Sequence, residues 1–201
     1  MSGIHTAGER EESNMSVQQH TIDILQELLH NATYIEDAQL DVFTQAILQA
    51  KHIFTAGAGR SGVAMRGFTN RLLHLGLSVS MVGEISSPHS QPDDLVIIGS
   101  GSGTTESLVA LANKAKKTGV KIALVTMDEE STIGKLADVV VVLPGVSPKL
   151  QHKGFDITSI QPMGSAFEQM SFITYDGVIL ELMEKMKETG ETMFPRHCDF
   201  E

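Results

Sequence analysis

The sequence predicts an α/β domain in which helices cover both faces of a parallel sheet. Two patterns indicate this fold. Short apolar segments alternate along the chain with segments whose apolar residues recur at helical spacing. The strand segments are almost continuously apolar, which is typical of parallel strands buried on both faces. The 201 residues are enough for one domain with a sizeable core.

Two helices are expected before the first strand. Ile24, Leu25 and Leu28 recur with helical spacing and predict a helix over residues 17–31. Phe43 and Ile47 predict a second helix over residues 37–50 by the same criterion.

The pattern then changes to strand and helix in alternation. A strand over residues 52–56 runs into glycines, and a helix over residues 63–74 follows, with Gly76 placed to end it. Gly119 is placed in the same way after a later helix. The remaining strands are expected at residues 77–82, 94–98, 121–126 and 139–143, and the helices between them at 105–117 and 132–137.

The last part of the chain differs from the alternating part. Residues 144–161 contain several Pro and Gly interruptions and are expected to form an irregular loop. A long helix is expected over residues 165–187. Because Phe167, Phe172 and Ile173 make its first part apolar on several sides, it is expected in the core or at a subunit interface.

Composition excludes several functions. The formal net charge of −10 disfavours nucleic acid as a partner. No apolar run approaches the ~20 residues of a membrane span, so no membrane partner is expected. Cys198 is the single cysteine, which fits a reducing, cytoplasmic location. Residues 1–14 are polar and are expected to be a disordered lead-in, with one domain over 15–201.

The clearest candidate for a binding site is the segment from Ser100 to Thr105. The apolar run 94–98 stops there at glycines and hydroxyls, and a helix follows. A strand that ends in such a loop presents backbone N–H groups and a helix N-terminus to one point, which suits a phosphate. The loop lacks the lysine of a P-loop, so a nucleoside triphosphate is a poor match.

A second glycine-rich loop follows the first strand. Gly57 to Gly62 matches G-x-G-x-x-G, and Glu84 ends the next strand, so a nicotinamide-dependent enzyme is an alternative. The glycines could also serve only tight strand-to-helix turns. Two hydroxyl-bearing loops after neighbouring strands favour convergence on one phosphorylated ligand instead.

Glu168 allows two interpretations. Ser165-x-x-Glu168 is the pattern of a capping box, with Ser165 as N-cap, and spacing alone favours that assignment. A carboxylate beside Phe167 at a helix start could also act as a general base.

The histidines and other ligand-type residues give weaker signals. His74 suits a helix C-terminus, and His197 lies in a C-terminal tail of the kind that is usually disordered. No His, Cys, Asp or Glu spacing resembles a metal site.

Taken in order, these segments resemble the sugar isomerase (SIS) family of phosphosugar-binding domains, and within it the hexuloisomerase branch. The chain departs from similar proteins at Thr104, where they usually carry Glu. The resemblance rests on residues 57–62, 71–76, 82–84, 100–103, 135–140, 162–168 and the pair Arg196-His197.

The resemblance implies a flavodoxin-like three-layer sandwich with a five-stranded parallel sheet and helices at both termini. It also implies site residues. Phosphate ligands would be Ser61, Ser100, Ser102 and Thr105, with Gly59, Arg60, Gly101 and Gly103 as further substrate contacts. The catalytic candidates would be Glu168, His74 and His197.

The implied activity is interconversion of 3-hexulose 6-phosphate and fructose 6-phosphate through an enediolate, without metal or other cofactor. The implied assembly is a homotetramer built as a dimer of dimers, with active sites near subunit boundaries. Two alternatives stay open: a non-catalytic phosphosugar sensor and an isomerase of the arabinose 5-phosphate type.

Overall fold

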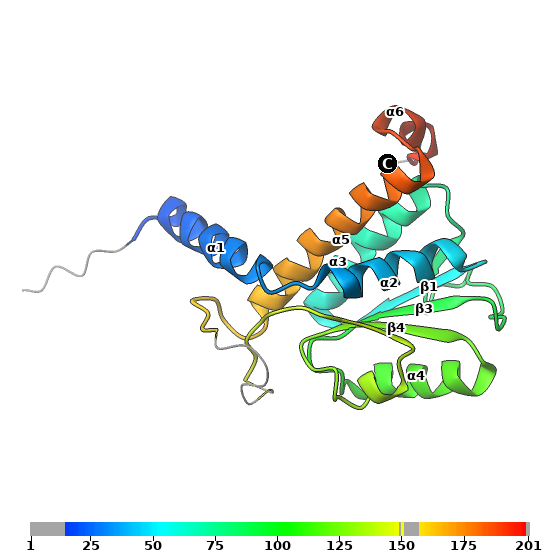
Figure 1. Ribbon diagram of the computed structural model, residues 1–201, viewed down its shortest axis with the longest axis horizontal. Coiled ribbons are helices and arrows are strands. Elements are labelled where there is room, and N and C mark those ends of the chain that lie inside the picture. The colour runs from blue at the N-terminus through cyan, green and yellow to red at the C-terminus, as the bar shows by residue number, and fades with distance from the viewer. Residues whose placement is uncertain (1–14, 149, 151–156, 200–201) are drawn as a thin grey trace, which may run out of the picture.

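A five-stranded parallel sheet in the order β2-β1-β3-β4-β5 forms the centre of the structure (Figure 1). This computed structural model describes residues 15–148, 150 and 157–199. The predicted strands are confirmed, although the second is shorter than expected. Their bounds are β1 (Ile53–Gly57), β2 (Val79–Met81), β3 (Leu95–Gly99), β4 (Lys121–Thr126) and β5 (Val139–Val142).

Helices cover both faces of the sheet, as the alternating pattern predicts. In Figure 1, α2, α3 and α5 lie on one face and α4 on the other, while α1 extends away from the sheet. The bounds are α1 (Val17–Ala32), α2 (Asp37–Gln49), α3 (Gly59–His74), α4 (Glu106–Thr118) and α5 (Ser165–Met186), with a 3₁₀ turn η1 (Gly134–Leu136). None of the helices in these described ranges is long and apolar enough to cross a membrane.

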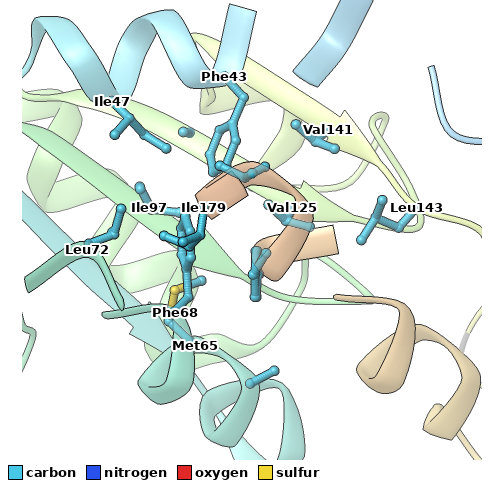
Figure 2. Close-up of a cluster of buried hydrophobic side chains, with 14 of the residues drawn as sticks. Phe43, Ile47, Met65, Phe68, Leu72, Ile97, Val125, Val141, Leu143 and Ile179 are labelled. Atoms are coloured by element: carbon cyan, nitrogen blue, oxygen red, sulfur yellow. The ribbon is translucent and has the colours of Figure 1, made fainter. Parts of the chain in front are cut away.

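The strands divide the core into two parts because successive side chains point to opposite faces. Ile97 of β3 and Val125 of β4 pack with Phe43 of α2, Phe68 of α3 and Ile179 of α5 (Figure 2). Phe54, Val96, Ile98 and Leu124 point the other way and pack with α4. Burial on both faces explains why these strands read as apolar runs.

The chain reverses its winding between β1 and β3, which are paired neighbours. β1 leads into α3 on one face, whereas β3 leads into α4 on the other. Ligands of open α/β sheets bind at the carboxyl ends of the strands at such a switch point. The register sets Gly57 beside Gly99, so both glycine-rich segments begin at this place.

Helix α3 begins at Gly59, four residues earlier than the predicted start at 63, so Arg60 and Ser61 lie in its first turn. The turn from β1 is very tight: a Cβ added to Gly57 would lie 2.9 Å from the Cα of Gly62. Gly76 and Gly119 follow their helices with positive φ, as predicted.

The C-terminal tail contains structure that the sequence pattern did not predict. Helix α6 (Gly190–Met193) and the 3₁₀ turn η2 (Phe194–Arg196) fold back on the end of α3. The expectation of a disordered tail is therefore wrong for residues up to 199. The expected lead-in, residues 1–14, lies outside the described residues.

Candidate functional site

A cavity of about 330 Å³ opens at the carboxyl ends of β1 and β3. It is lined from both glycine-rich segments, so the two loops meet at one place in the fold. Its lining residues are Ala58, Ser61, Gly99, Ser100, Gly101, Ser102, Thr105, Leu108, Met127, Ser147, Pro148, Met163, Gly164, Phe167 and Glu168.

Hydroxyl groups and a helix N-terminus form one side of this cavity. Ser100, Ser102 and Thr105 line it, and Thr105 is the N-cap of α4 without a side-chain capping bond. Gly103 has a φ of 59° and packs so closely on the Ser131 side chain that a Cβ would overlap it. The first N–H groups of α4 and these hydroxyls can together bind an anion.

Ser61 contributes a further hydroxyl from the first turn of α3. This turn, like that of α4, carries the positive end of a helix dipole toward the switch point. The N-termini of α3 and α4 and the hydroxyls of Ser61, Ser100, Ser102 and Thr105 therefore adjoin one cavity, which is a chemical environment suited to a phosphate group.

Glu168 lines the cavity from the first part of α5. Its Oε2 accepts a hydrogen bond from Arg60 Nε at 2.9 Å, and Arg60 Nη1 also lies 3.4 Å from the Ser165 hydroxyl. Arg60 itself is outside the cavity lining, although it adjoins it through this pair. The Glu168 carboxylate is thus held by Arg60 and lines the same cavity as the hydroxyls of Ser100, Ser102 and Thr105.

The capping-box assignment for Ser165 and Glu168 is wrong. Gly164 is the N-cap of α5, Ser165 is its first helical residue, and no side-chain capping bond forms. The reason is the partner from α3, because Arg60 pairs with Glu168 and approaches the Ser165 hydroxyl. The contact between Arg60 and Glu168, which are 108 positions apart in the sequence, replaces the expected capping bond between Ser165 and Glu168.

Apolar side chains form the remaining wall. Leu108, Met127 and Phe167 line it together with the backbone of Gly101. A Cβ at Gly101 would come within 2.9 Å of the Met127 methyl group and 3.0 Å of the Phe167 ring. This apolar wall shapes the cavity beside the hydroxyl-bearing loops.

Tyr175 supports the floor of the cavity from below. Its ring stacks on Phe68 at 4.6 Å, and a Cβ on Gly99 would lie 3.0 Å from its hydroxyl. Burial raises the pKa of Tyr175 well above its usual range, so the phenol stays protonated. Its role here is packing under the end of β3.

His74 and His197 lie together but away from this cavity. Their rings stack with centroids 5.2 Å apart at the C-terminal end of α3. Helix α3 has 16 residues, and at 1.5 Å per residue its two ends are about 22 Å apart. Within one chain, the structure does not bring either histidine to Glu168.

Arg71 and Arg196 contact His74, and Glu188 binds Arg196. Arg71 donates to His74 Nδ1 at 3.2 Å, and because guanidinium has no acceptor, a neutral His74 carries its proton on Nε2. Arg196 donates to the His74 carbonyl oxygen at 2.8 Å and to both oxygens of Glu188. Another hollow, lined partly by Arg71, Asp176 and both histidines, adjoins the pair.

The sequence predicted most of the polar residues that line the cavity, but not the apolar residues of its wall. Gly59 and Gly103 lie beside the cavity lining and serve backbone geometry, and Glu84 is exposed beyond β2. The missed lining residues include Met127, Ser147 and Met163. Of these three residues, only Met163 could have been found from the sequence, because it lies within the segment 162–168 that carries the family resemblance.

The structure offers no cluster of three or more His, Cys, Asp or Glu side chains suited to a metal ion within residues 15–148, 150 and 157–199. The cavity lining and the adjoining Arg60 present hydroxyls, backbone amides, a carboxylate and a guanidinium.

Comparison with known proteins places this site in a family. The profile of the SIS domain matches residues 46–172, which include both glycine-rich segments and Glu168. The chain belongs to the SIS domain family. A 3-hexulose-6-phosphate isomerase of Bacillus subtilis is 47% identical over 93% of this chain and 100% of its own length.

Two further proteins are similar over most of this chain. A 3-hexulose-6-phosphate isomerase of Mycobacterium gastri is 37% identical over 87% of this chain and 86% of its own. A crystal structure from Methanococcus jannaschii, for which a 3-hexulose-6-phosphate isomerase function was inferred, is 33% identical with a TM-score of 0.73. The match covers 91% of this chain and 96% of the Methanococcus jannaschii chain.

Proposed function

We propose that the protein is an isomerase that interconverts 3-hexulose 6-phosphate and fructose 6-phosphate. The observation that carries this proposal is the cavity in which an anion-binding set of hydroxyls faces a carboxylate, Glu168. The named relatives in Bacillus subtilis and Mycobacterium gastri support the same reaction.

The chemistry requires moving a ketone between C3 and C2 of a phosphorylated sugar. Ser61, Ser100, Ser102 and Thr105 bind the phosphate and hold the sugar in place. Glu168 takes the proton from C2, the electron pair forms the C2–C3 double bond of an enediolate, and the same carboxyl returns the proton to C3. His197 or His74 takes the proton from the C2 oxygen and returns one to the C3 oxygen.

Arg60 orients Glu168 for this step. Its Nε bond holds one carboxylate oxygen in place, and its positive charge adjoins the region where the enediolate carries negative charge. Gly59, Gly101 and Gly103 let the backbone approach the sugar phosphate closely.

His74 and His197 act on the oxygens of the enediolate from a neighbouring copy of the chain. The stacked pair lies far from Glu168 of its own chain, so this role needs an assembly in which active sites lie near subunit boundaries. Exposed apolar residues support an assembly, including Leu29 of α1 and Phe172 and Leu180 of α5. We place the chain in a homotetramer formed as a dimer of dimers.

The same proposal includes a single domain over residues 15–201 and a cytoplasmic location. The substrate is a small, soluble sugar phosphate, and the net charge of −10 argues against nucleic acid as a partner.

The test is incubation of the purified protein with 3-hexulose 6-phosphate and a coupled assay for fructose 6-phosphate. We expect steady turnover without added metal. Tight binding of the sugar phosphate with no turnover would contradict the isomerase proposal and would indicate a sensor. Turnover of arabinose 5-phosphate in place of hexulose 6-phosphate would contradict the substrate assignment.

A further inference from the structure

Helix α1 precedes the segment that matches the SIS profile, yet it contacts the wall of the candidate site. Glu27 of α1 accepts three hydrogen bonds from residues 132 to 134 positions further along the chain. Ser159 Oγ lies 2.6 Å and Gln161 Nε2 3.2 Å from its Oε1, and the Ile160 N–H lies 3.0 Å from Oε2. Both carboxylate oxygens are used.

These bonds hold the segment that leads into α5. Residues 159–161 are followed directly by Pro162, Met163 and the N-cap Gly164. Met163 has a φ of 54°, which lies in the left-handed region of backbone conformation. A residue other than glycine stays there only when the surrounding structure holds it. Ser159 Oγ also accepts from the Gln161 N–H at 3.0 Å, which tightens the turn before it.

The segment 162–165 is a thin wall with space on both sides. Met163 and Gly164 line the candidate site. Pro162 and Ser165 line a second, open hollow of about 890 Å³, to which Glu27 also belongs. Because hollows adjoin both sides, close packing supports this wall poorly, and the hydrogen bonds to Glu27 are placed to define its position.

The geometry points to Glu27 as a positioning residue that aligns Glu168 for proton transfer. This inference rests on the proposed isomerase function. Glu168 lies one helical turn after the N-cap Gly164, so a shift of the preceding wall moves the carboxylate. The phosphate-binding hydroxyls of residues 100–105 belong to a different element and stay in place.

Replacing Glu27 should therefore affect turnover more than binding. Glu27→Ala should lower kcat at least about tenfold, because misplacement of a reacting group by ~1 Å can cost up to ~100-fold. The KM should change by less than about threefold. Glu27→Gln keeps one acceptor oxygen and should have an intermediate kcat.

Two variants separate this role from a loss of folding. Gln26→Ala changes the adjacent residue of α1, which lines the same hollow, and should keep the wild-type kcat. Ser159→Ala removes a partner of Glu27 Oε1. If both residues act through one contact, the double variant should lose little more than Glu27→Ala alone.

Hydrogen exchange of residues 158–165 in the full chain provides a readout that does not depend on activity. Faster exchange in Glu27→Ala than in Gln26→Ala, together with the fall in kcat, would support the inference. Unchanged exchange, or a wild-type kcat with a lowered melting temperature only, would overturn it. If the wild-type protein shows no isomerase activity, the proposed function fails, and exchange alone then decides whether Glu27 holds the wall.

Discussion

Among individual side chains, the pair of Arg60 and Glu168 shows how the candidate base is prepared. Arg60 lies in the first turn of α3 and holds Glu168, which lies in the first part of α5, through a 2.9 Å bond. The partner of Glu168 therefore comes from another helix. The Glu168 carboxylate lines the cavity together with the candidate anion-binding hydroxyls.

Glu168→Gln keeps the size of the side chain and removes its basicity. We expect kcat to fall at least about 100-fold, the typical contribution of a general base, while fructose 6-phosphate binds within a few-fold of wild type. Steady-state kinetics and calorimetry check this. Glu184→Gln, at an exposed position on the same helix, is the matched control, and normal turnover by Glu168→Gln would remove the assignment.

Thr104 stands where similar proteins usually carry Glu, and the structure gives it a local role. Its hydroxyl donates to Ser102 Oγ at 3.1 Å. With that acceptor position occupied, the Ser102 hydroxyl proton is left to donate to a phosphate.

Thr104→Val should therefore weaken sugar phosphate binding by about 3- to 10-fold, the range expected for one hydrogen bond, with little change in kcat. Thr104→Ser should restore the wild-type KM. Titration with inorganic phosphate provides an independent measurement. Equal affinities of Thr104→Val and the wild type would show that Ser102 needs no help from Thr104.

Among the elements, helices α3 and α5 pack as a pair, and polar contacts link the pair at both ends. Arg60 joins their N-terminal turns, and Arg196, which follows α5, bonds the last carbonyl of α3. The two helices therefore run in the same direction, with the cavity at one end and the histidine pair at the other. Glu188 completes the second fastening through its two bonds to Arg196.

Glu188→Gln should loosen the tail that carries His197. The Arg196 guanidinium, with the Thr192 hydroxyl, lowers the pKa of Glu188 below its usual range. A lowered carboxyl pKa means that this stabilisation is present at neutral pH and disappears as the pH falls through the lowered value. In the wild type, loosening should therefore begin only below the usual glutamate pKa of about 4.3.

The measurement is the NMR line width of the His197 ring, which should narrow in Glu188→Gln at pH 7 and in the wild type only at acid pH. Glu191→Gln, on the adjacent turn of α6, is the control. A broad His197 signal in Glu188→Gln at neutral pH would contradict this account of the tail.

For the whole molecule, Glu168 lies far from His74 and His197 of the same chain. The proposed reaction therefore needs an assembly in which a neighbouring chain supplies the histidines. Apolar side chains remain exposed on both α1 and α5, with Leu29 73% and Leu180 63% exposed. A monomer leaves such surfaces in water, whereas a homo-oligomer covers them. Sedimentation of the purified protein should give the mass of four chains.

Mixing two inactive variants tests whether one active site uses two chains. Glu168→Gln and His197→Asn should each turn over poorly. Subunit exchange between them should recover measurable activity, because some sites then combine an intact Glu168 with an intact His197. Failure to recover activity in hybrids shown to form by native mass spectrometry would contradict a shared site.

Local rules predict the order of strands and helices and the two glycine-rich segments whose hydroxyls line the cavity. Apolar spacing reports burial within a few turns, and Gly57, Gly62 and Gly103 mark places where the backbone has no room for a Cβ. The base among the catalytic candidates was named by resemblance, since local spacing favoured a helix cap.

The partners of the charged side chains depend on how the elements pack in three dimensions. Arg60 replaced the local cap at Glu168, Glu27 reached residues 159–161, and Arg196 brought His197 to His74. Each contact joins segments far apart along the chain, and its free energy depends on how the packed elements place the two groups. Spacing within one segment carries no information about that placement, so the sequence pattern located the candidate binding loops, while the fold determined how the proposed proton-transfer groups are held.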